Sequence, residues 1–143
     1  MYRISKKLVD DLSYQIMGAA MEVHRIFGPG LIEKNYEEAL AHELFLRGLQ
    51  VQRQQSVLVP YKDIILESPL RYDILVEGVV VVENKAVMDM HPVFQATLLT
   101  YMKHLKAPKG MLFNFHVRNL FRDGQKTFVN EFYAVLPDRK SVV

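Results

Sequence analysis

Residues 71–86, RYDILVEGVVVVENKA, form a valine-rich run with charged residues at both ends. Enrichment in β-branched residues is typical of strands, and the glycine at position 78 indicates a turn inside the run. The run therefore predicts a β-hairpin with one strand over residues 70–76 and a second over residues 79–87. Any fold for this chain has to accommodate these two strands and the charges that they carry.

Two charged residues, Glu83 and Lys85, interrupt the second strand. Because side chains alternate along a strand, both lie on the same face. A charge taken out of water costs several kcal/mol unless it is paired or holds a metal. The face is therefore either solvated or functional, and an ion pair between Glu83 and Lys85 on a solvated sheet surface is the structural alternative.

The register of the hairpin decides whether Asp73 joins this pair. A strict two-residue loop points Asp73 to the other face of the sheet. A three-residue loop over residues 76–78, with Gly78 in the left-handed position of a bulge, places Asp73 opposite Val81 and diagonal to Glu83, roughly 6 Å away. The glycine favours this second register, in which two carboxylates can bind a hard divalent cation through oxygen.

Helical periodicity and capping residues predict three helices around these strands. The helices are expected from Ser5, an N-cap, to about residue 27; from the Gly28-Pro29-Gly30 break to Gly48; and from His91-Pro92 to about residue 105. Further strands are expected over residues 50–61, 64–66, 110–116 and 127–135. This order, ααββββαββ, predicts a single α/β domain over residues 1–143, with a mixed β-sheet flanked by helices.

Composition excludes several classes of site. The 143 residues are 50% hydrophobic and 24% charged, which is ordinary for a globular domain. The absence of cysteine excludes disulfides, thiolate catalysis and cysteine-based zinc sites. No apolar run approaches the roughly 18 residues of a membrane span, and the N-terminal segment lacks the apolar core of a secretory leader. We therefore expect a cytoplasmic protein with no membrane partner.

A basic segment lies in the C-terminal part of the chain. The net charge is only +2, yet six cations gather here against one acid, Asp123: Lys103, Lys106, Lys109, Arg118, Arg122 and Lys126. Such a segment fits a solvated face as well as it fits a surface that binds the phosphates of nucleic acid.

Two motifs resemble a known group of proteins. Asp73, the short hairpin and the ENK of residues 83–85 resemble the PD-(D/E)XK nuclease signature, although Tyr72 replaces the proline of its opening dipeptide. The segment GLIEKNY, residues 30–36, matches the motif of the GxxExxY family, a group of small bacterial proteins within that nuclease superfamily. The likeness covers most of the chain and includes LLTYMKH in the third helix and MLFNF in the strand that follows.

The resemblance implies a restriction-endonuclease-like core that binds Mg²⁺ or Mn²⁺. In the pattern of the superfamily, Asp73 and Glu83 are the metal ligands, and the backbone carbonyl of Asn84 adds a further ligand. Lys85 orients or activates the attacking water. Glu33 matches the acidic residue that many members supply from their first core helix, although an acidic residue there also favours the positive N-terminus of a helix.

The implied activity is metal-dependent hydrolysis of phosphodiester bonds in nucleic acid, with DNA as the expected partner. Lys103, Lys106 and Arg118 are the expected nucleic-acid contacts, together with Tyr101, for which packing is the simpler interpretation. The competing class is a catalytically inactive module that binds nucleic acid or a protein partner. Thr97 favours that class, because relatives often carry glutamine there. A homodimer is expected if a domain this small cuts both strands of a duplex at once.

Overall fold

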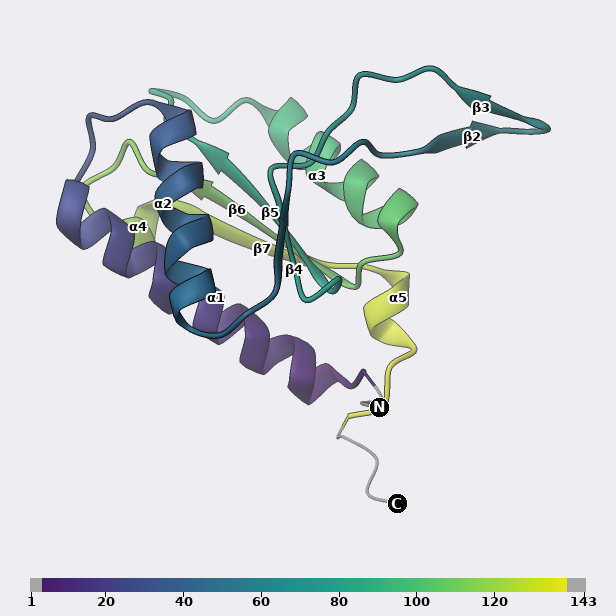
Figure 1. Ribbon diagram of the computed structural model, residues 1–143, viewed down its shortest axis with the longest axis horizontal. Coiled ribbons are helices and arrows are strands. Elements are labelled where there is room, and N and C mark those ends of the chain that lie inside the picture. The colour runs from purple at the N-terminus through teal and green to yellow at the C-terminus, as the bar shows by residue number, and fades with distance from the viewer. Residues whose placement is uncertain (1–3, 139–143) are drawn as a thin grey trace.

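The chain forms a five-stranded sheet, and Figure 1 shows helices on both of its faces. The computed structural model describes residues 4–138 of the chain. The helices are α1 (Lys6–Phe27), α2 (Glu33–Leu46), α3 (Pro92–Leu105) and the single-turn helices α4 (Leu120–Asp123) and α5 (Glu131–Ala134). The sheet has the order β1-β4-β5-β6-β7 and consists of β1 (Val51–Arg53), β4 (Ile74–Val76), β5 (Val80–Lys85), β6 (Lys109–Asn114) and β7 (Gln125–Val129). The predicted α/β fold with a mixed sheet is confirmed.

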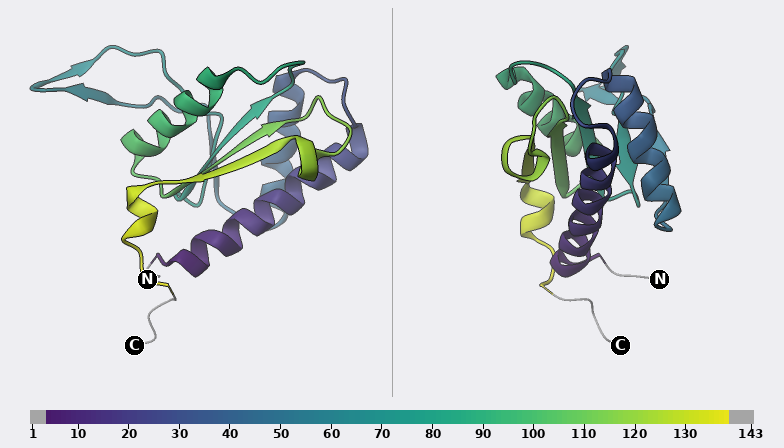
Figure 2. Two further views of the ribbon diagram at one scale, coloured as in Figure 1. Left: turned by 180° about the vertical axis from the view of Figure 1, so that it is seen from behind. Right: turned by 90° about the vertical axis from the view of Figure 1, so that its left-hand side faces the viewer.

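Each face of the sheet packs against its own helices, as Figure 2 shows. One hydrophobic cluster joins α1 and α2 to the sheet and includes Val80 and Val82 of β5. The other cluster joins α3 to the opposite face and includes Val81. Alternate valines of one strand therefore enter different cores, which explains why the run is apolar at successive positions.

Cap geometry confirms three of the predicted helix boundaries. The Ser5 hydroxyl accepts a hydrogen bond from the N–H of Leu8 (3.1 Å), and the His91 ring nitrogen Nδ1 accepts one from the N–H of Val93 (3.0 Å). Gly48 follows α2 with φ +82°, the left-handed conformation that favours glycine after a helix. Within residues 4–138, no helix is long and apolar enough to cross a membrane.

The first turns of α2 and α3 lie near the same edge of the sheet. β5 and β6 are parallel and are connected through α3, whereas the other neighbours in the sheet are antiparallel. Parallel strands end at the same edge, so the carboxyl ends of β5 and β6 lie together. At that edge Lys85, the last residue of β5, contacts Glu33 at the start of α2 and Phe94 near the start of α3.

The predicted continuous strand over residues 50–61 is wrong. β1 ends at Arg53, and Gln54 has a left-handed backbone (φ +52°) that turns the chain out of the sheet. The chain then forms a separate hairpin of β2 (Val59–Tyr61) and β3 (Ile64–Leu66), which projects from the body of the molecule (Figure 1). This part of the chain holds one strand more than predicted.

The last predicted strand, residues 127–135, is correct only in its first part. β7 ends at Val129 and the short helix α5 follows. The Asn130 side chain caps this helix, because its Oδ1 accepts hydrogen bonds from the N–H groups of Phe132 and Tyr133. An asparagine N-cap thus outweighs the strand preference of the aromatic residues that come after it.

The β4–β5 register differs from both registers considered from sequence. Residues 77–79 connect the strands, and both Glu77 (φ +54°) and Gly78 (φ +67°) have a left-handed backbone. Because the glutamate adopts the conformation that was expected only of the glycine, the pairing shifts by two residues. A shift of two keeps every side chain on its predicted face. It places Asp73 directly opposite Glu83 instead of diagonal to it.

Candidate active site

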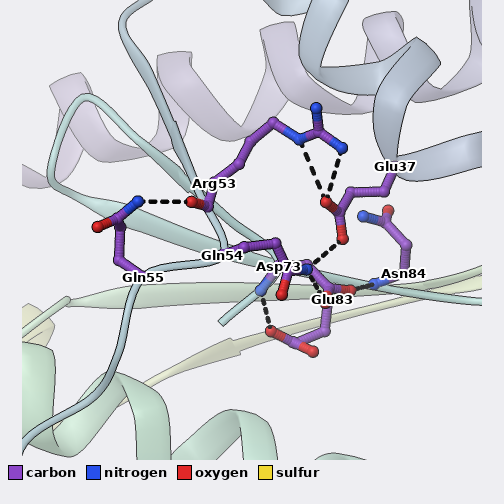
Figure 3. Close-up of polar contacts among 7 residues, drawn as sticks. All are labelled: Glu37, Arg53, Gln54, Gln55, Asp73, Glu83 and Asn84. Carbon is purple, nitrogen blue, oxygen red and sulfur yellow. Dashed lines mark hydrogen bonds and ion pairs between the residues drawn. The ribbon is translucent and has the colours of Figure 1, made fainter. Parts of the chain in front are cut away.

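Asp73 and Glu83 lie next to each other across the β4–β5 hairpin, as Figure 3 shows. The N–H of Asp73 donates to Glu83 Oε1 (2.9 Å), and the N–H of Asn84 donates to Asp73 Oδ2 (2.8 Å). Each carboxylate is therefore held by a backbone N–H of the opposite strand. Glu83 is only 6% exposed and Asp73 is partly buried. The structure thus brings together the two carboxylates that the sequence singled out.

Burial makes ionisation of this pair unfavourable. Burial raises the pKa of Asp73 to about 6, against the opposing effect of the hydrogen bond from the Asn84 N–H, and the nearby charge of Glu37 raises it further. Burial is also the main cause that raises the pKa of Glu83 to about 8, and the charge of Asp73 adds to it. Lys85 acts in the opposite direction on both carboxyls. Two carboxyls that resist losing their protons are suited to a site that a cation completes.

We expect the metal-free protein to lose stability as pH rises from 5 to 9. Both folded-state pKa values, about 6 and about 8, lie above those of carboxyls in an unfolded chain. Folding then takes up protons, so the contribution is full at low pH and is lost as pH rises through the folded values. Urea unfolding in EDTA at a series of pH values measures the free energy of unfolding and hence its pH dependence. Glu83→Gln is expected to flatten this pH dependence, and Glu38→Gln, at an exposed position of α2, is the control. Equal slopes in wild type and Glu83→Gln would contradict the prediction.

Lys85 completes the charged group at the end of β5. Its Nζ lies 3.5 Å from Glu33 Oε1 and 4.4 Å from the centroid of the Phe94 ring. The ring face attracts the ammonium, and the carboxylate neutralises part of its charge. Only 22% of the Lys85 side chain is exposed, so helices on both sides of the sheet hold the ammonium beside the Asp73–Glu83 pair.

The GxxExxY motif determines where Glu33 lies. Tyr36 is fully buried, and its ring stacks on Phe115 with the centroids 4.5 Å apart. The Tyr36 hydroxyl donates to the carbonyl of Gly28 and accepts a hydrogen bond from the N–H of Leu31. The tyrosine thereby ties the loop before α2 to the core, and the helix begins at Glu33.

Three residues that sequence reasoning missed support Asp73. Glu37 of α2 is 6% exposed and accepts hydrogen bonds from Arg53 Nη2 (2.9 Å) at Oε2 and from Gln54 Nε2 (2.7 Å) at Oε1. The same Gln54 amide group donates to Asp73 Oδ1 (3.3 Å), and the Gln54 N–H donates to the Asp73 carbonyl (3.1 Å). This network, drawn in Figure 3, connects α2 to Asp73 through the bend after β1. Gln54 therefore orients the Asp73 carboxylate.

The spacing of the sequence could have pointed to Glu37 as a neighbour of Glu33. Glu33 and Glu37 are four residues apart, which places them on neighbouring turns of one helix side. Arg53 and Gln54 reach Glu37 because the backbone bends at Gln54 in a left-handed conformation. No local sequence pattern predicts this bend.

The donor atoms present fit a small, hard divalent cation. Within residues 4–138, no group of three or more histidine, cysteine, aspartate or glutamate side chains could hold a metal ion. The available set is therefore the two carboxylates of Asp73 and Glu83, to which the Asn84 carbonyl would be added. Mg²⁺ is often bound by only one or two carboxylates and keeps several waters. A cation would also offset the repulsion between the two buried carboxylates, so the residues fit the expected metal.

Asn84 would contribute through its backbone. Its side chain is fully buried, and the amide Oδ1 and Nδ2 have no hydrogen-bond partner among the described residues. Alternation along β5 places this side chain on the face opposite Glu83 and Lys85. The backbone carbonyl of Asn84 therefore remains the predicted metal ligand, and the side-chain amide has no part in that prediction.

The predicted basic contacts do not form one surface. Lys103 and Lys106 are exposed at the C-terminal end of α3, whereas Lys85 contacts the beginning of that helix. Arg118 is exposed after β6 and lines the same shallow hollow as His24 of α1. Nucleic acid that reaches all three cations and the carboxylates would have to cross more than one face of the domain.

Tyr101 is a residue of α3 whose side chain lies in the hydrophobic core. It is 6% exposed and belongs to the hydrophobic cluster that also contains Leu98 and Met102. Burial raises its pKa to about 12, and the nearby charges of Glu83 and Asp73 act in the same direction. The tyrosine thus packs close to the carboxylates, which favours a packing role over contact with nucleic acid.

A comparison with protein families agrees with the fold. A family model described as the PD-(D/E)XK nuclease superfamily matches residues 10–128. The chain therefore belongs to the PD-(D/E)XK nuclease superfamily, as a member of its GxxExxY-type family. No curated protein and no solved structure matches the chain.

Proposed function

We propose that this protein hydrolyses phosphodiester bonds in nucleic acid with the help of Mg²⁺ or Mn²⁺. The observation that supports this most directly is the pairing of the partly buried Asp73 with the buried Glu83, with the Lys85 ammonium held at the same end of β5. Two carboxylates and a cation are the components that metal-assisted attack of water on a phosphate requires. Membership of a nuclease superfamily supports nucleic acid as the substrate.

Each residue of the site has a defined task in this reaction. Asp73 and Glu83 would hold the metal, which when bound makes water more acidic and offsets charge on the scissile phosphate. The Lys85 ammonium stabilises the negative charge that develops in the transition state, and its contact with Glu33 keeps it in place. Gln54 orients the Asp73 carboxylate from the side away from Asn84.

The experiment that tests the proposal is single-turnover cleavage of labelled substrates. The substrates are single-stranded, duplex and branched DNA and single-stranded RNA, each with Mg²⁺ and then Mn²⁺, and binding is measured separately in Ca²⁺. We expect cleavage of at least one substrate. Binding in Ca²⁺ without cleavage of any substrate would instead support the inactive binding module.

We expect Lys103→Ala and Lys106→Ala to weaken nucleic-acid binding. Each change removes at most one phosphate contact, so the slope of log affinity against log salt should fall by up to about 1. Because both residues lie far along α3 from Lys85, the cleavage rate at saturation should stay the same. Arg118→Ala tests the separate position beside α1.

Lys7→Ala is the matched control for these variants, because it removes the same charge from an exposed residue of α1. Fluorescence anisotropy across a salt series measures the slopes. If Lys103→Ala and Lys106→Ala bind like Lys7→Ala at every salt concentration, the predicted contacts on α3 are wrong.

A further inference from the structure

The side chain of Asn114 is bonded to the backbone at the edge of the sheet where the candidate active site lies. Asn114 is the last residue of β6, is 5% exposed and pairs in register with Lys85 of β5. Its Nδ2 donates to the carbonyl of Val87 (3.0 Å), and its Oδ1 accepts from the N–H groups of Val87 (3.1 Å) and His116 (3.2 Å). One amide therefore holds the chains that leave both parallel strands.

These bonds continue the β5–β6 pairing beyond the point where its backbone ladder stops. The N–H of Phe115 donates to the carbonyl of Lys85 (2.8 Å), and both backbone groups of Val87 then bond to the Asn114 side chain. An amide offers a donor and an acceptor together, so it satisfies an N–H and a C=O as a neighbouring strand would. The path of the chain after Lys85 is thus fixed by the sheet and then by this side chain.

Asn114 is itself held in place. Its N–H donates to the carbonyl of Gly124 (2.8 Å). A Cβ at Gly124 would lie 2.5 Å from the Asn114 carbonyl oxygen, so this close approach requires a glycine. Leu112, two residues before Asn114, packs in the cluster under α3, and alternation places the amide on the same face of the sheet as Lys85.

The segment held by this amide connects the two groups that meet at the ammonium. Residues 86–91 lead from Lys85 at the end of β5 to the start of α3 at Pro92. Phe94, in the first turn of α3, lies under the ammonium, with Nζ 4.4 Å from the ring centroid. Because Val87 bonds this connection to β6, its release would let the lysine and the aromatic ring shift relative to each other.

We propose that Asn114 is a positioning residue of the active site, which holds the segment after Lys85 so that the ammonium stays beside Glu33 and on the Phe94 ring. Asn114 acts through Lys85 and is assigned no contact with metal or substrate. The effect on cleavage rests on the proposed function, whereas the effect on the position of the ammonium does not.

Nuclear magnetic resonance measures the position of Lys85 without any substrate. Protons over the face of an aromatic ring are shifted upfield, so the ε-methylene protons of Lys85 should resonate upfield of those of solvated lysines. Spectra of protein with isotope-labelled lysines show this signal, and its disappearance in Lys85→Ala identifies it. In Asn114→Ala we expect the signal to move toward the position of solvated lysines.

Asn130→Ala is the matched control, because Asn130 makes the same kinds of bond elsewhere. Its Nδ2 donates to the Ala107 carbonyl (2.9 Å), and its Oδ1 accepts from the N–H groups of Phe132 (3.1 Å) and Tyr133 (3.3 Å). Ala107 precedes β6, so this amide lies at the other end of that strand. The control should lower the melting temperature as well, but leave the Lys85 signal at its wild-type position.

Single-turnover cleavage is the second readout. A displaced ammonium loses its effect in the transition state, so Asn114→Ala should cleave about tenfold or more slowly with nearly unchanged affinity in Ca²⁺. In a Lys85→Ala background the same change should slow cleavage by less than about threefold, because the group through which Asn114 acts is already absent. Asn130→Ala should cleave like wild type.

A Lys85 signal that keeps its wild-type position in folded Asn114→Ala would overturn the proposal, and so would an equal displacement in Asn130→Ala. If Asn114→Ala does not fold, Asn114→Asp takes its place. Its carboxylate keeps an acceptor for the two N–H groups but loses the donor to the Val87 carbonyl, so we expect a displacement in the same direction.

The two readouts separate this proposal from the proposed nuclease activity. Equal rate losses from Asn114→Ala with and without Lys85 would show that the amide does not act through the lysine, which contradicts the proposal. Wild-type protein that cleaves no substrate would contradict the nuclease activity instead, and the position of the Lys85 signal then decides the role of Asn114.

Discussion

Lys85→Ala is expected to lower single-turnover cleavage by about 100-fold or more and to leave nucleic-acid affinity nearly unchanged. The reason is that the ammonium acts mainly on charge that appears in the transition state, whereas ground-state binding rests on other cations. Its position supports this division, because Lys85 is held 3.5 Å from Glu33 beside the carboxylates and is only 22% exposed.

The control for this variant is Lys7→Ala, which removes the same side chain from an exposed helix position paired with Asp11. Its cleavage rate and affinity should equal those of wild type. Melting curves check that Lys85→Ala is folded, since the change also removes the contact with the Phe94 ring. Cleavage that survives Lys85→Ala undiminished would mean that another site, or a contaminant, performs the reaction.

Mg²⁺ or Mn²⁺ is expected to raise the melting temperature of the wild-type protein by several degrees, and Asp73→Asn or Glu83→Gln is expected to abolish this shift. A ligand that binds only the folded state stabilises it in proportion to the logarithm of its concentration over its dissociation constant. At metal concentrations about ten times that constant, the gain is about 1.4 kcal/mol, which corresponds to several degrees for a domain of this size.

The size of the shift should also depend on pH. The metal must displace the proton from Glu83, whose pKa is raised to about 8, so the shift should be larger at pH 8.5 than at pH 6. Without metal, Glu83→Gln should itself melt at a higher temperature than wild type at pH 8.5, because it removes a buried charge from beside Asp73.

Glu38→Gln provides the control for the metal effect, since it neutralises an exposed carboxylate on the same helix as Glu33. Differential scanning fluorimetry measures the melting temperature in the metal salt and in NaCl at the same ionic strength, and the difference between the two is the metal shift. Equal metal shifts in wild type, Asp73→Asn and Glu83→Gln would show that the metal binds elsewhere. That result would remove the basis of the proposed mechanism even if the fold assignment stands.

The network behind Asp73 fixes the position of its carboxylate. Glu37 is buried and held by Arg53 and Gln54, and Gln54 also reaches Asp73. The arrangement extends the site from the hairpin to α2 without adding a further metal ligand among the described residues. It also ties the left-handed bend at Gln54 to the carboxylate that the proposed reaction uses.

Local signals in the sequence were sufficient for much of the fold. The caps at Ser5 and His91 and the glycine at position 48 mark helix ends correctly, because capping depends on atoms only a few residues apart. The valine run predicted its two strands, because β-branched side chains favour extended backbone. The family motifs predicted Glu83 and Lys85 as site residues, and the structure places both near the carboxyl end of β5.

Tertiary structure alone decided the register and the surroundings of the site. Glu77 adopts a left-handed backbone in the β4–β5 turn, so Asp73 pairs directly with Glu83, although the sequence favoured a diagonal arrangement. The left-handed bend at Gln54 likewise interrupted a segment whose composition favours a strand. In both cases long-range pairing stabilises a backbone conformation that the local residue does not prefer.

Chain position also proved a poor guide to spatial proximity. Lys103 and Arg118 belong to one basic segment of the sequence, yet they lie on different elements, at the end of α3 and beside α1. Glu37 and Gln54 are 17 residues apart and share a hydrogen bond. Sequence alone determined which residue types and local elements this protein has, because those follow from short-range preferences. Which residues meet at the site was decided by packing, because contacts between distant segments depend on the whole sheet.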